Sequence, residues 1–340
     1  MKISFLVTYY QQEKYVQESL DSILSLKKPP EWDILIGDDG STDGTAAAAQ
    51  SYVDRDPEHI RLYIMDRDPN RKYNAVERAS ANRMNLVRHA TGDCYCLMAG
   101  DDFYSEADFV PEALSILESR PEVSVVGFGT WIYQDGSPVR KQPGRRAAPV
   151  PVHRKKYLRW KYTHAGACVI RKAPAKEELA VPERLGIFDD NGVTLNALSR
   201  GKLYLSARPV YAYRQAGNSV YTEMDPAERA ALNLMGLGVC LQMMGPAWEK
   251  DVLARFASAV WMAWFLRKNL PERMNQFKYQ TYLDGCRRAE FCQGEKLLRW
   301  PELNEAERKK VRRWVWEAGR QSPPRILYAW LQTHGRRAKA

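Results

Sequence analysis

Short apolar runs alternate with helical patterns along the first half of the chain, and this alternation limits the fold more than any other feature. The apolar runs lie at residues 3–7, 32–37, 60–65, 94–98 and 123–128. Between them apolar residues recur at helical spacing, as in residues 13–26 and 75–89. Strands separated by helices indicate βαβ units. The sequence therefore predicts an α/β fold with a mainly parallel, Rossmann-like sheet flanked by helices.

The second part of the chain has a different pattern. Strand signals fade beyond Tyr221, and three segments have helical spacing with prolines between them, namely 226–244, 249–268 and 304–319. We therefore expect two regions, an α/β domain over residues 1–220 and a helical C-terminal region over residues 221–340 that ends in a basic tail.

Cysteine usage and apolar segments indicate a cytoplasmic protein. The six cysteines are scattered without a CxxC pair, as is usual for reduced thiols. Residues 3–7 are too short for a secretory apolar region, which needs roughly 7–15 residues. The longest apolar run, at residues 256–266, is about half of what a membrane-spanning helix requires.

The net charge of +10 is concentrated at the C-terminal end. From Glu295 onward there are 12 Lys and Arg against 5 Glu, so the preceding body is close to neutral and nucleic acid is not an expected partner. Two interpretations of the tail stay open. It could contact the anionic inner face of a membrane, or it could be a solvated helical face with a frayed basic end.

Polar clusters follow three of the predicted strands. They occupy residues 8–13, 38–45 and 100–103. In an open parallel sheet, ligands bind outside the carboxyl ends of the strands, and these clusters share that edge. The sequence therefore predicts a ligand site there.

Each acidic cluster also has a simpler explanation. Residues 38–45, Asp-Asp-Gly-Ser-Thr-Asp-Gly-Thr, could be only a turn and a helix cap, whereas Asp39 could accept from a nucleobase N–H. Asp101 and Asp102 repel each other unless a cation or strong donors compensate, and one of them could cap a following helix. Asp189 and Asp190 precede a helical run whose N-terminus acids favour.

Together these motifs resemble family 2 glycosyltransferases with the GT-A fold. The most specific match is the octapeptide 38–45, which agrees in full, and residues 8–15 resemble the segment after the family's first strand with Gln11 in place of the commoner Asn. The acidic pair 101–102 matches the family's DxD-type motif. The pair 189–190 stands where the family has the Glu-Asp that supplies its base. The resemblance covers roughly residues 1–220.

The resemblance implies a role for each candidate residue. Asp190 is the expected general base of an inverting transfer. A nucleotide site is implied at Thr8, Tyr10, Glu13, Asp39, Arg83 and Asp101. Mn²⁺ or Mg²⁺ is implied on Asp102, with Asp101 on the ribose or sharing the metal. His164 and Asp189 are weaker candidates for acceptor contacts. Arg83 is equally compatible with a surface ion pair, and His164 with a structural role.

Two departures from the family pattern bear on this expectation. Ala99 replaces the first acid of the longer acidic motif, and Asp189 shortens the first carboxylate of the base pair by one methylene. Ala99 is the one hint of an alternative, a non-catalytic nucleotide-sugar-binding protein of the same ancestry. A nucleotidyltransferase or a dehydrogenase is not expected, because no glycine-rich phosphate loop follows the first strand.

The expected partners follow from the same resemblance. They are a nucleotide-sugar donor, for which UDP is the expected nucleotide, and a saccharide or lipid-linked saccharide acceptor. The corresponding biological setting is cell-surface polysaccharide or lipopolysaccharide assembly.

Overall fold

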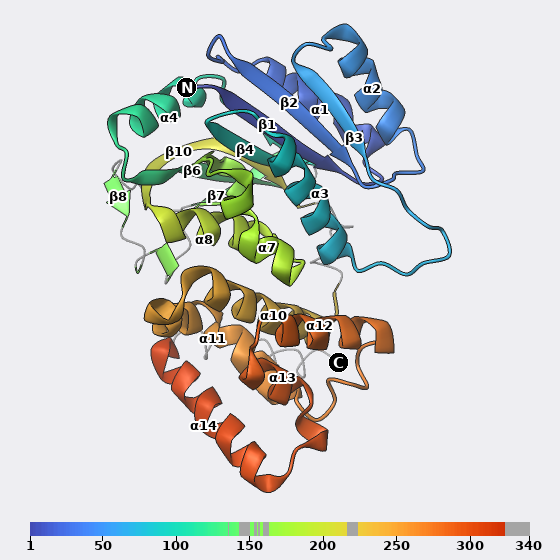
Figure 1. The fold of residues 1–340 in the computed structure, drawn as a ribbon, viewed down its shortest axis with the longest axis vertical. Helices are drawn as coiled ribbons and strands as arrows, with labels where there is room; N and C mark the ends of the chain where they lie inside the picture. The colour runs from blue at the N-terminus through green and yellow to red at the C-terminus, as the bar shows by residue number, and fades with distance from the viewer. Residues whose placement is uncertain are drawn as a thin grey trace. The chain divides into compact units, whose positions relative to one another are not determined.

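The chain forms two compact units in a computed structural model (Figure 1). The first unit contains residues 1–154 and 161–216, and the second contains residues 155–160 and 217–340. The structure describes residues 1–134, 136–142, 150–152, 155, 157–158, 163–215 and 224–323. Each unit is considered separately below.

The first unit is built on one sheet with the strand order β3-β2-β1-β4-β9-β6-β10-β5, with β7 beside β6 and β8 beside β10. The strands are β1 (Ile3–Tyr9), β2 (Trp32–Asp38), β3 (Ile60–Ile64), β4 (Cys94–Ala99), β5 (Phe103–Tyr104), β6 (Val123–Gln134), β7 (Ser137–Gln142), β8 (Val150–Val152), β9 (Cys168–Arg171) and β10 (Lys202–Arg214). The predicted α/β class with flanking helices is confirmed.

The register of the central strands places the acidic clusters at one edge. β1 pairs in parallel with both β2 and β4, so that Thr8 lies opposite Gly37 on one side and Ala99 on the other. The chain therefore leaves β1, β2 and β4 at the same level, and residues 8–13, 38–45 and 100–103 come together as expected for parallel strands.

Two strands depart from the sequence prediction. β9 runs antiparallel to both of its neighbours, β4 and β6, so the sheet is mixed at this point. β10 extends over residues 202–214, outside the five apolar runs identified in the sequence, and pairs in parallel with β6. The pairing partners decide both features, because the extra length of β10 lies against β6 and the short β5.

The helices of the first unit cover the sheet (Figure 1). They are α1 (Glu13–Leu24), α2 (Thr45–Arg55), α3 (Ala75–His89), α4 (Phe109–Ser119), α6 (Ala175–Glu178), α7 (Ala180–Leu185) and α8 (Asp190–Arg200), with the 3-10 turn η1 (Ala165–Ala167). α4, the helix that follows the acidic pair, begins at Phe109. Its N-cap residue is Asp108, so Asp102 does not cap it.

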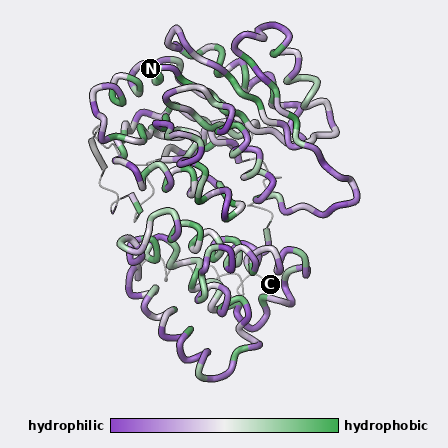
Figure 2. The backbone as a smooth tube through the Cα atoms, viewed as in Figure 1, coloured by the Kyte–Doolittle hydropathy of each residue, from purple (hydrophilic) through white to green (hydrophobic). Residues whose placement is uncertain are grey.

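The core of this unit lies between the sheet and its helices, and Figure 2 shows apolar segments running through the strands. Phe5 and Val7 of β1 are at most 1% exposed and share one cluster with Val16 and Leu20 of α1. A strand buried on both faces shows a continuous apolar run instead of alternation. This burial explains why the short runs of the sequence identify the central strands.

The second unit is helical. Its elements are α10 (Pro226–Met244), η2 (Pro246–Trp248), α11 (Glu249–Leu266), α12 (Gln276–Arg288), α13 (Cys292–Leu298), η3 (Trp300–Glu302) and α14 (Glu305–Gln321). Three helices match the predicted segments, whereas α12 and α13 were not predicted. In the part of the chain that the structure describes, no helix is long and apolar enough to cross a membrane. None of the six cysteines forms a disulfide.

Candidate active site

The turn after β2 holds Asp39 at the sheet edge. The side chain of Asp38 is fully buried and accepts from the backbone N–H of Ser41 at 2.9 Å, which closes the turn. Gly40 has a φ of +68° in this turn, and a Cβ there would lie 2.7 Å from a backbone oxygen. The octapeptide thus does form a turn, and the turn presents the next carboxylate, Asp39, beside β1.

Asp39 is held by two arginines that the sequence did not single out. Nη2 of Arg67 lies 2.6 Å from one carboxylate oxygen, and Nε of Arg78 donates to the other at 2.6 Å. Arg67 also lies over the ring of Tyr10, 4.0 Å from its centroid, and 5.2 Å from the centroid of Tyr73. A nucleobase N–H that approached Asp39 would share its oxygens with these guanidinium groups, since a carboxylate offers about four lone-pair sites.

Three of the other predicted nucleotide residues, Thr8, Tyr10 and Glu13, lie from the end of β1 to the start of α1. Thr8 is partly buried near the end of β1, and the ring of Tyr10 is 44% exposed. Glu13 begins α1 and accepts from the backbone N–H of Gly44 at 3.0 Å. These residues come together as the sequence predicted, although their roles toward a ligand remain predictions.

Asp102 is a buried acid just beyond the end of β4. It is 2% exposed, and its oxygens accept from the hydroxyl of Tyr211 at 2.6 Å and from the backbone N–H of Arg214 at 2.8 Å. Burial raises the pKa of Asp102 well above its usual value, and the neighbouring Asp101 adds to this shift. Burial also raises the pKa of Asp101. The pair is therefore an unfavourable arrangement of charge that a cation would relieve.

The donor set fits a metal site that substrate completes. Within the described residues, no group of three or more His, Cys, Asp and Glu side chains could hold a metal. Mg²⁺ is commonly bound through one or two carboxylates, with waters and substrate phosphates as its other ligands. Asp102 retains lone pairs beyond its two hydrogen bonds, so this acid and Asp101 match such a site and not a cage made by protein alone.

Asp190, the first residue of α8, is held between two cationic or proton-bearing groups. Nη2 of Arg83 lies 3.0 Å from one carboxylate oxygen, and Nε2 of His164 lies 3.6 Å from the other. The side chain of Asp190 is nevertheless 41% exposed. Of the two interpretations of Arg83, the structure shows an ion pair, but with the expected base and not with a surface group.

His164 has a defined orientation. Its Nδ1 accepts from the backbone N–H of Gly166 at 3.1 Å, so the proton of a neutral ring is on Nε2, which faces Asp190. The ring stacks on Tyr211 with 5.4 Å between centroids and lies 4.9 Å from Tyr213. The hydroxyl of Tyr211 also donates to Asp102. Tyr211 and His164 therefore form a chain of contacts from Asp102 to Asp190, the expected base.

One small cavity joins these groups. Its volume is about 50 Å³, and it is lined by two acids, Asp102 and Asp190, and by Arg83 and His164. The other residues at its wall are Leu97, Met98, Ala99, Ala165, Gly166, Tyr211 and Tyr213. The absence of a side-chain acid at Ala99 therefore leaves an apolar wall beside Asp102. The structure thus places two carboxylates, Asp102 of the acidic pair and Asp190, around one space.

Asp189 is the N-cap residue of α8. Its Oδ1 accepts from the backbone N–H of Gly192 at 2.7 Å, which caps α8. Burial raises the pKa of this carboxyl. The simpler explanation in the sequence, an acid that favours a helix N-terminus, thus applies to Asp189.

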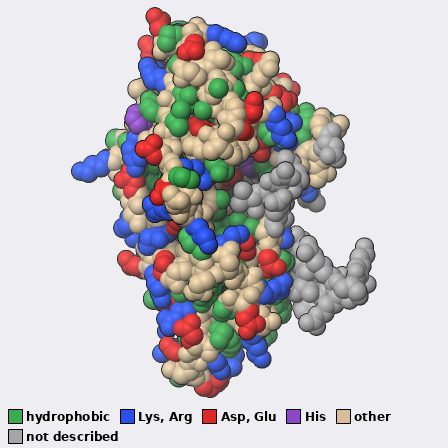
Figure 3. Space-filling model, turned by 90° about the vertical axis from the view of Figure 1, so that its right-hand side faces the viewer, with side chains coloured by type: hydrophobic (Ala, Val, Ile, Leu, Met, Phe, Trp, Pro, Cys, Tyr) green, Lys and Arg blue, Asp and Glu red, His purple; other side chains and the backbone are tan. Residues whose placement is uncertain are grey.

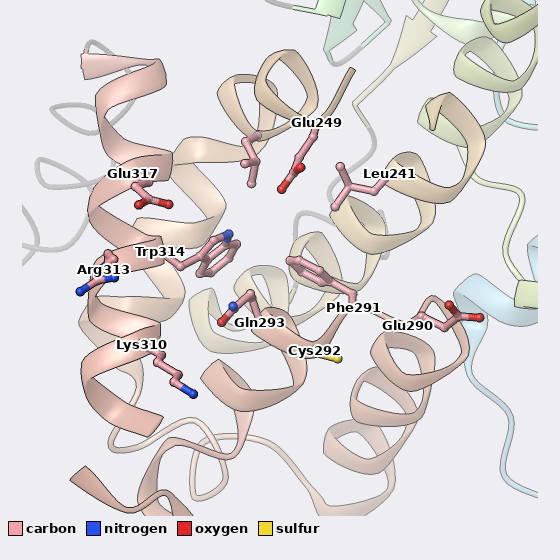
Figure 4. Close-up of a pocket in the computed structure, with 11 residues that line it drawn as sticks. Leu241, Glu249, Glu290, Phe291, Cys292, Gln293, Lys310, Arg313, Trp314 and Glu317 are labelled. Atoms are coloured by element: carbon pink, nitrogen blue, oxygen red, sulfur yellow. The ribbon is translucent and has the colours of Figure 1, made fainter. Parts of the chain in front are cut away.

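A larger cavity of about 550 Å³ lies within the helical unit (Figure 4). Phe291 and Trp314 point into it, and Glu249, Lys310 and Arg313 are among the charged residues around it. None of the residues predicted for the active site lines it. Its lining mixes both signs of charge with apolar groups, so the cavity alone does not identify a ligand.

Comparison with known proteins agrees with this geometry. A sequence profile described as "Glycosyl transferase family 2" matches residues 4–178, about half of the chain. The chain therefore belongs to glycosyl transferase family 2, as the sequence predicted.

Curated relatives match over the sheet-containing part. The chain is 31% identical over 134 residues to "Putative glycosyltransferase EpsE" of Bacillus subtilis, covering 39% of this chain and 45% of that protein. It is 24% identical over 139 residues to "Putative teichuronic acid biosynthesis glycosyltransferase TuaG" of the same organism, covering 41% and 51%. The chain thus matches about half the length of these relatives.

Solved structures show the same fold. Residues 1–349 of S. aureus TarS align with a TM-score of 0.58 and 17% identity, covering 94% of this chain and 92% of that one. The mannosyltransferase PcManGT of Pyrobaculum calidifontis aligns with a TM-score of 0.50 and 17% identity, covering 95% and 87%. At these identities the likeness establishes the GT-A-type fold alone.

Proposed function

We propose that this protein is an inverting glycosyltransferase that moves a sugar from a nucleotide-sugar donor to an acceptor hydroxyl. The observation that carries the proposal is the shared cavity, which is lined by Asp102 of the acidic pair and by Asp190. An inverting transfer needs a base and a place for the departing diphosphate on opposite sides of the reacting carbon. Family membership supports the same reaction class.

The reaction is a single displacement. The carboxylate of Asp190 accepts the proton of the acceptor hydroxyl while that oxygen attacks the anomeric carbon and the nucleoside diphosphate departs. Arg83 and His164 fix the carboxylate from both sides, which limits the orientations that the base can take. His164 is in this account a positioning residue for the base, in place of the acceptor contact that the sequence predicted.

Asp101 and Asp102 are the proposed metal and ribose site. A bound Mn²⁺ or Mg²⁺ ion would supply a Lewis acid that neutralises charge on the diphosphate. Arg214 closes this part of the site, because its backbone N–H donates to Asp102 and its Nε donates to the carbonyl of Asp101 at 2.8 Å. Support for a metal comes from PcManGT, which was solved with GDP-Man and Mn²⁺.

The nucleoside of the donor is proposed to lie against Thr8, Tyr10, Glu13 and Asp39. UDP is the favoured nucleotide, since TarS was solved in complex with UDP-GlcNAc and shares the fold. PcManGT was solved with GDP-Man. We therefore propose a transferred group of the hexosyl or N-acetylhexosaminyl class. Arg67 and Arg78 join this subsite, because they hold the Asp39 carboxylate.

The acceptor is proposed to be a saccharide or lipid-linked saccharide in cell-surface polysaccharide or lipopolysaccharide assembly. The name of TuaG, which refers to teichuronic acid biosynthesis, supports this setting. We place the protein in the cytoplasm, with peripheral contact to the inner face of the membrane through its basic tail. Residues 324–340 of that tail lie outside the described part of the chain.

Binding and turnover together test the proposal. Titration calorimetry with UDP-sugars, with and without Mn²⁺, should show binding that the metal strengthens, and an assay of UDP release should show turnover when an acceptor is added. Metal-strengthened binding without turnover for any acceptor would favour the alternative, a non-catalytic nucleotide-sugar-binding protein. Absence of binding to every donor would refute both.

A further inference from the structure

One large apolar side chain of α14 (labelled in Figure 1) is exposed to solvent, namely Trp316. Trp316 is 63% exposed, more than any other described large hydrophobic side chain. Scattered single apolar residues are normal on protein surfaces, so exposure of one indole is not by itself informative. Its neighbours on the helix are the second observation.

Basic side chains surround Trp316 along the helix. Consecutive residues of an α-helix are about 100° apart around its axis, so positions three, four and seven residues away share the face of Trp316. Four of those positions are basic, namely Lys309, Arg312, Arg313 and Arg320, and the other two are Gly319 and Pro323. We call the four basic residues and Trp316 the α14 patch.

The patch has a clear excess of positive charge. Glu305 shares this face and pairs with Arg312. No ion pair joins Lys309, Arg313 or Arg320 to a described carboxylate. Glu317 borders the patch, about 100° from Trp316 and about 40° from Arg313 around the helix. Basic and acidic side chains intermix on the face of the molecule drawn in Figure 3, whereas the α14 patch has four cations to one carboxylate.

The indole of Trp316 packs against an aromatic side chain of α11. The ring of Trp261 on α11 meets it edge-on, with 5.5 Å between centroids and planes at 88°, and Phe265 lies 5.7 Å from Trp261. The core-facing side of α14 is already filled by Val311, Trp314, Val315 and Ala318. Trp316 therefore has no place in the core and stands outward on a rigid aromatic base.

We propose that the α14 patch is a docking surface for an anionic lipid bilayer. Tryptophan is favoured at the boundary between headgroups and acyl chains, and the cations around it match the negative surface potential of anionic lipids. The inference deepens the proposed membrane location and relies on it, but it is independent of the donor and of the transfer reaction. It also differs from the proposed contact through residues 324–340, because it assigns the contact to α14.

Vesicle binding by the full chain tests this surface. The protein should sediment with vesicles of mixed phosphatidylglycerol and phosphatidylcholine but not with phosphatidylcholine alone, and added salt should weaken the binding. The Arg320→Glu variant should lower the partition constant by about fivefold or more, given about 1 kcal/mol for each cation near such a surface. Trp316→Ser should lower it by a similar factor.

Matched variants separate the patch from general effects. Lys250→Glu makes the same charge change at an exposed site on α11, and Phe277→Ser removes an aromatic side chain that is 37% exposed on α12. Both should bind vesicles like the unaltered protein. UDP release in solution should be the same for Trp316→Ser and for the unaltered protein, so loss of vesicle binding is distinguishable from loss of the transferase.

Three outcomes would overturn the inference. One is equal vesicle binding by Trp316→Ser, Arg320→Glu and the unaltered protein. Another is equal loss in the Lys250→Glu control, which would indicate attraction by net charge alone. The third is binding to a single-stranded oligonucleotide through the same residues without binding to anionic vesicles, which would assign the patch to nucleic acid.

Discussion

Three side chains define the proposed chemistry at the scale of single residues. Nη2 of Arg83 lies 3.0 Å from one carboxylate oxygen of Asp190, and Nε2 of His164 lies 3.6 Å from the other. The sequence named all three because each lies in or near a motif of the family, but it could not show that they meet. Arg83 is about 105 residues from α8 along the chain, and only the folded sheet brings α3 and α8 together.

The role of His164 predicts a loss of rate without a loss of donor affinity. His164→Ala should lower kcat by up to about 100-fold, the scale of effect expected when a reacting group is misplaced by about 1 Å. The KM for the donor should change little, since the ring contacts the base and not the nucleoside. Steady-state kinetics across pH would measure both. His164→Gln, which keeps a donor in reach of Asp190, should restore part of the rate, whereas an unchanged kcat in His164→Ala would refute the positioning role.

Asp39 predicts the opposite pattern. Asp39→Asn removes a charged hydrogen-bond acceptor and leaves Arg67 and Arg78 without their carboxylate. Loss of a charged hydrogen bond of about 1.5–3 kcal/mol corresponds to roughly 10- to 100-fold weaker binding of UDP. Calorimetric titration would measure this change. The control is Asp68→Asn, which makes the same substitution at an exposed residue between β3 and α3. Equal affinity in Asp39→Asn would exclude Asp39 from the nucleotide site.

At the scale of elements, the sequence identified the strands whose burial is continuous and missed what depends on pairing. β1, β2 and β4 are short apolar runs with polar clusters after them, so their positions could be predicted to within a residue or two. The direction of β9 could not, because four residues carry no signal of parallel or antiparallel pairing. Arg67 and Arg78 were missed for a similar reason, since no local pattern distinguishes them from surface arginines before the turn is folded.

The N-terminus of α8 carries a pH dependence. Burial raises the pKa of Asp189, so its protonated form is favoured in the folded state. Its favourable contribution is then complete below the ordinary Asp pKa of about 3.9 and is lost as the pH rises through the raised value. Asp189→Asn keeps the cap acceptor but cannot ionise. The variant should therefore gain stability relative to the unaltered protein as the pH rises above 4.

Thermal unfolding of both proteins from pH 4 to pH 7 measures this difference. The midpoint of Asp189→Asn minus that of the unaltered protein should increase across the range. A constant difference would show that Asp189 titrates in the fold as it does in the unfolded chain. The Asp54→Asn variant makes the same substitution at an exposed carboxylate on α2 and is the control.

At the scale of the whole molecule, the two units differ in what their sequences disclose. The first unit contains every residue of the proposed site, and the family profile ends within it at residue 178. Its family could be predicted because the acidic motifs follow the strands, and ligands of an α/β sheet bind outside the carboxyl ends of the strands. The helical unit has no such motif, and its helices α12 and α13, its 550 Å³ cavity and its α14 patch became visible only in the folded chain.

Donor binding should raise the thermal stability of the protein. A ligand at 100 times its Kd stabilises the folded state by about 2.7 kcal/mol through mass action. UDP with Mn²⁺ should therefore raise the unfolding midpoint by several degrees, and chelation of the metal should reduce that gain. Differential scanning fluorimetry over a set of nucleoside diphosphates would measure it and would identify the nucleotide. No shift with any nucleotide at millimolar concentration would contradict a donor site in the first unit.

The central claim is that Asp190 is the base of a glycosyl transfer, and it has a direct measurement. UDP release from a UDP-sugar in the presence of an acceptor should fall by roughly 10²- to 10⁴-fold in Asp190→Asn, the usual contribution of a positioned general base, while calorimetry shows UDP binding within a few-fold of the unaltered protein. Transfer by Asp190→Asn at the unaltered rate would contradict the account.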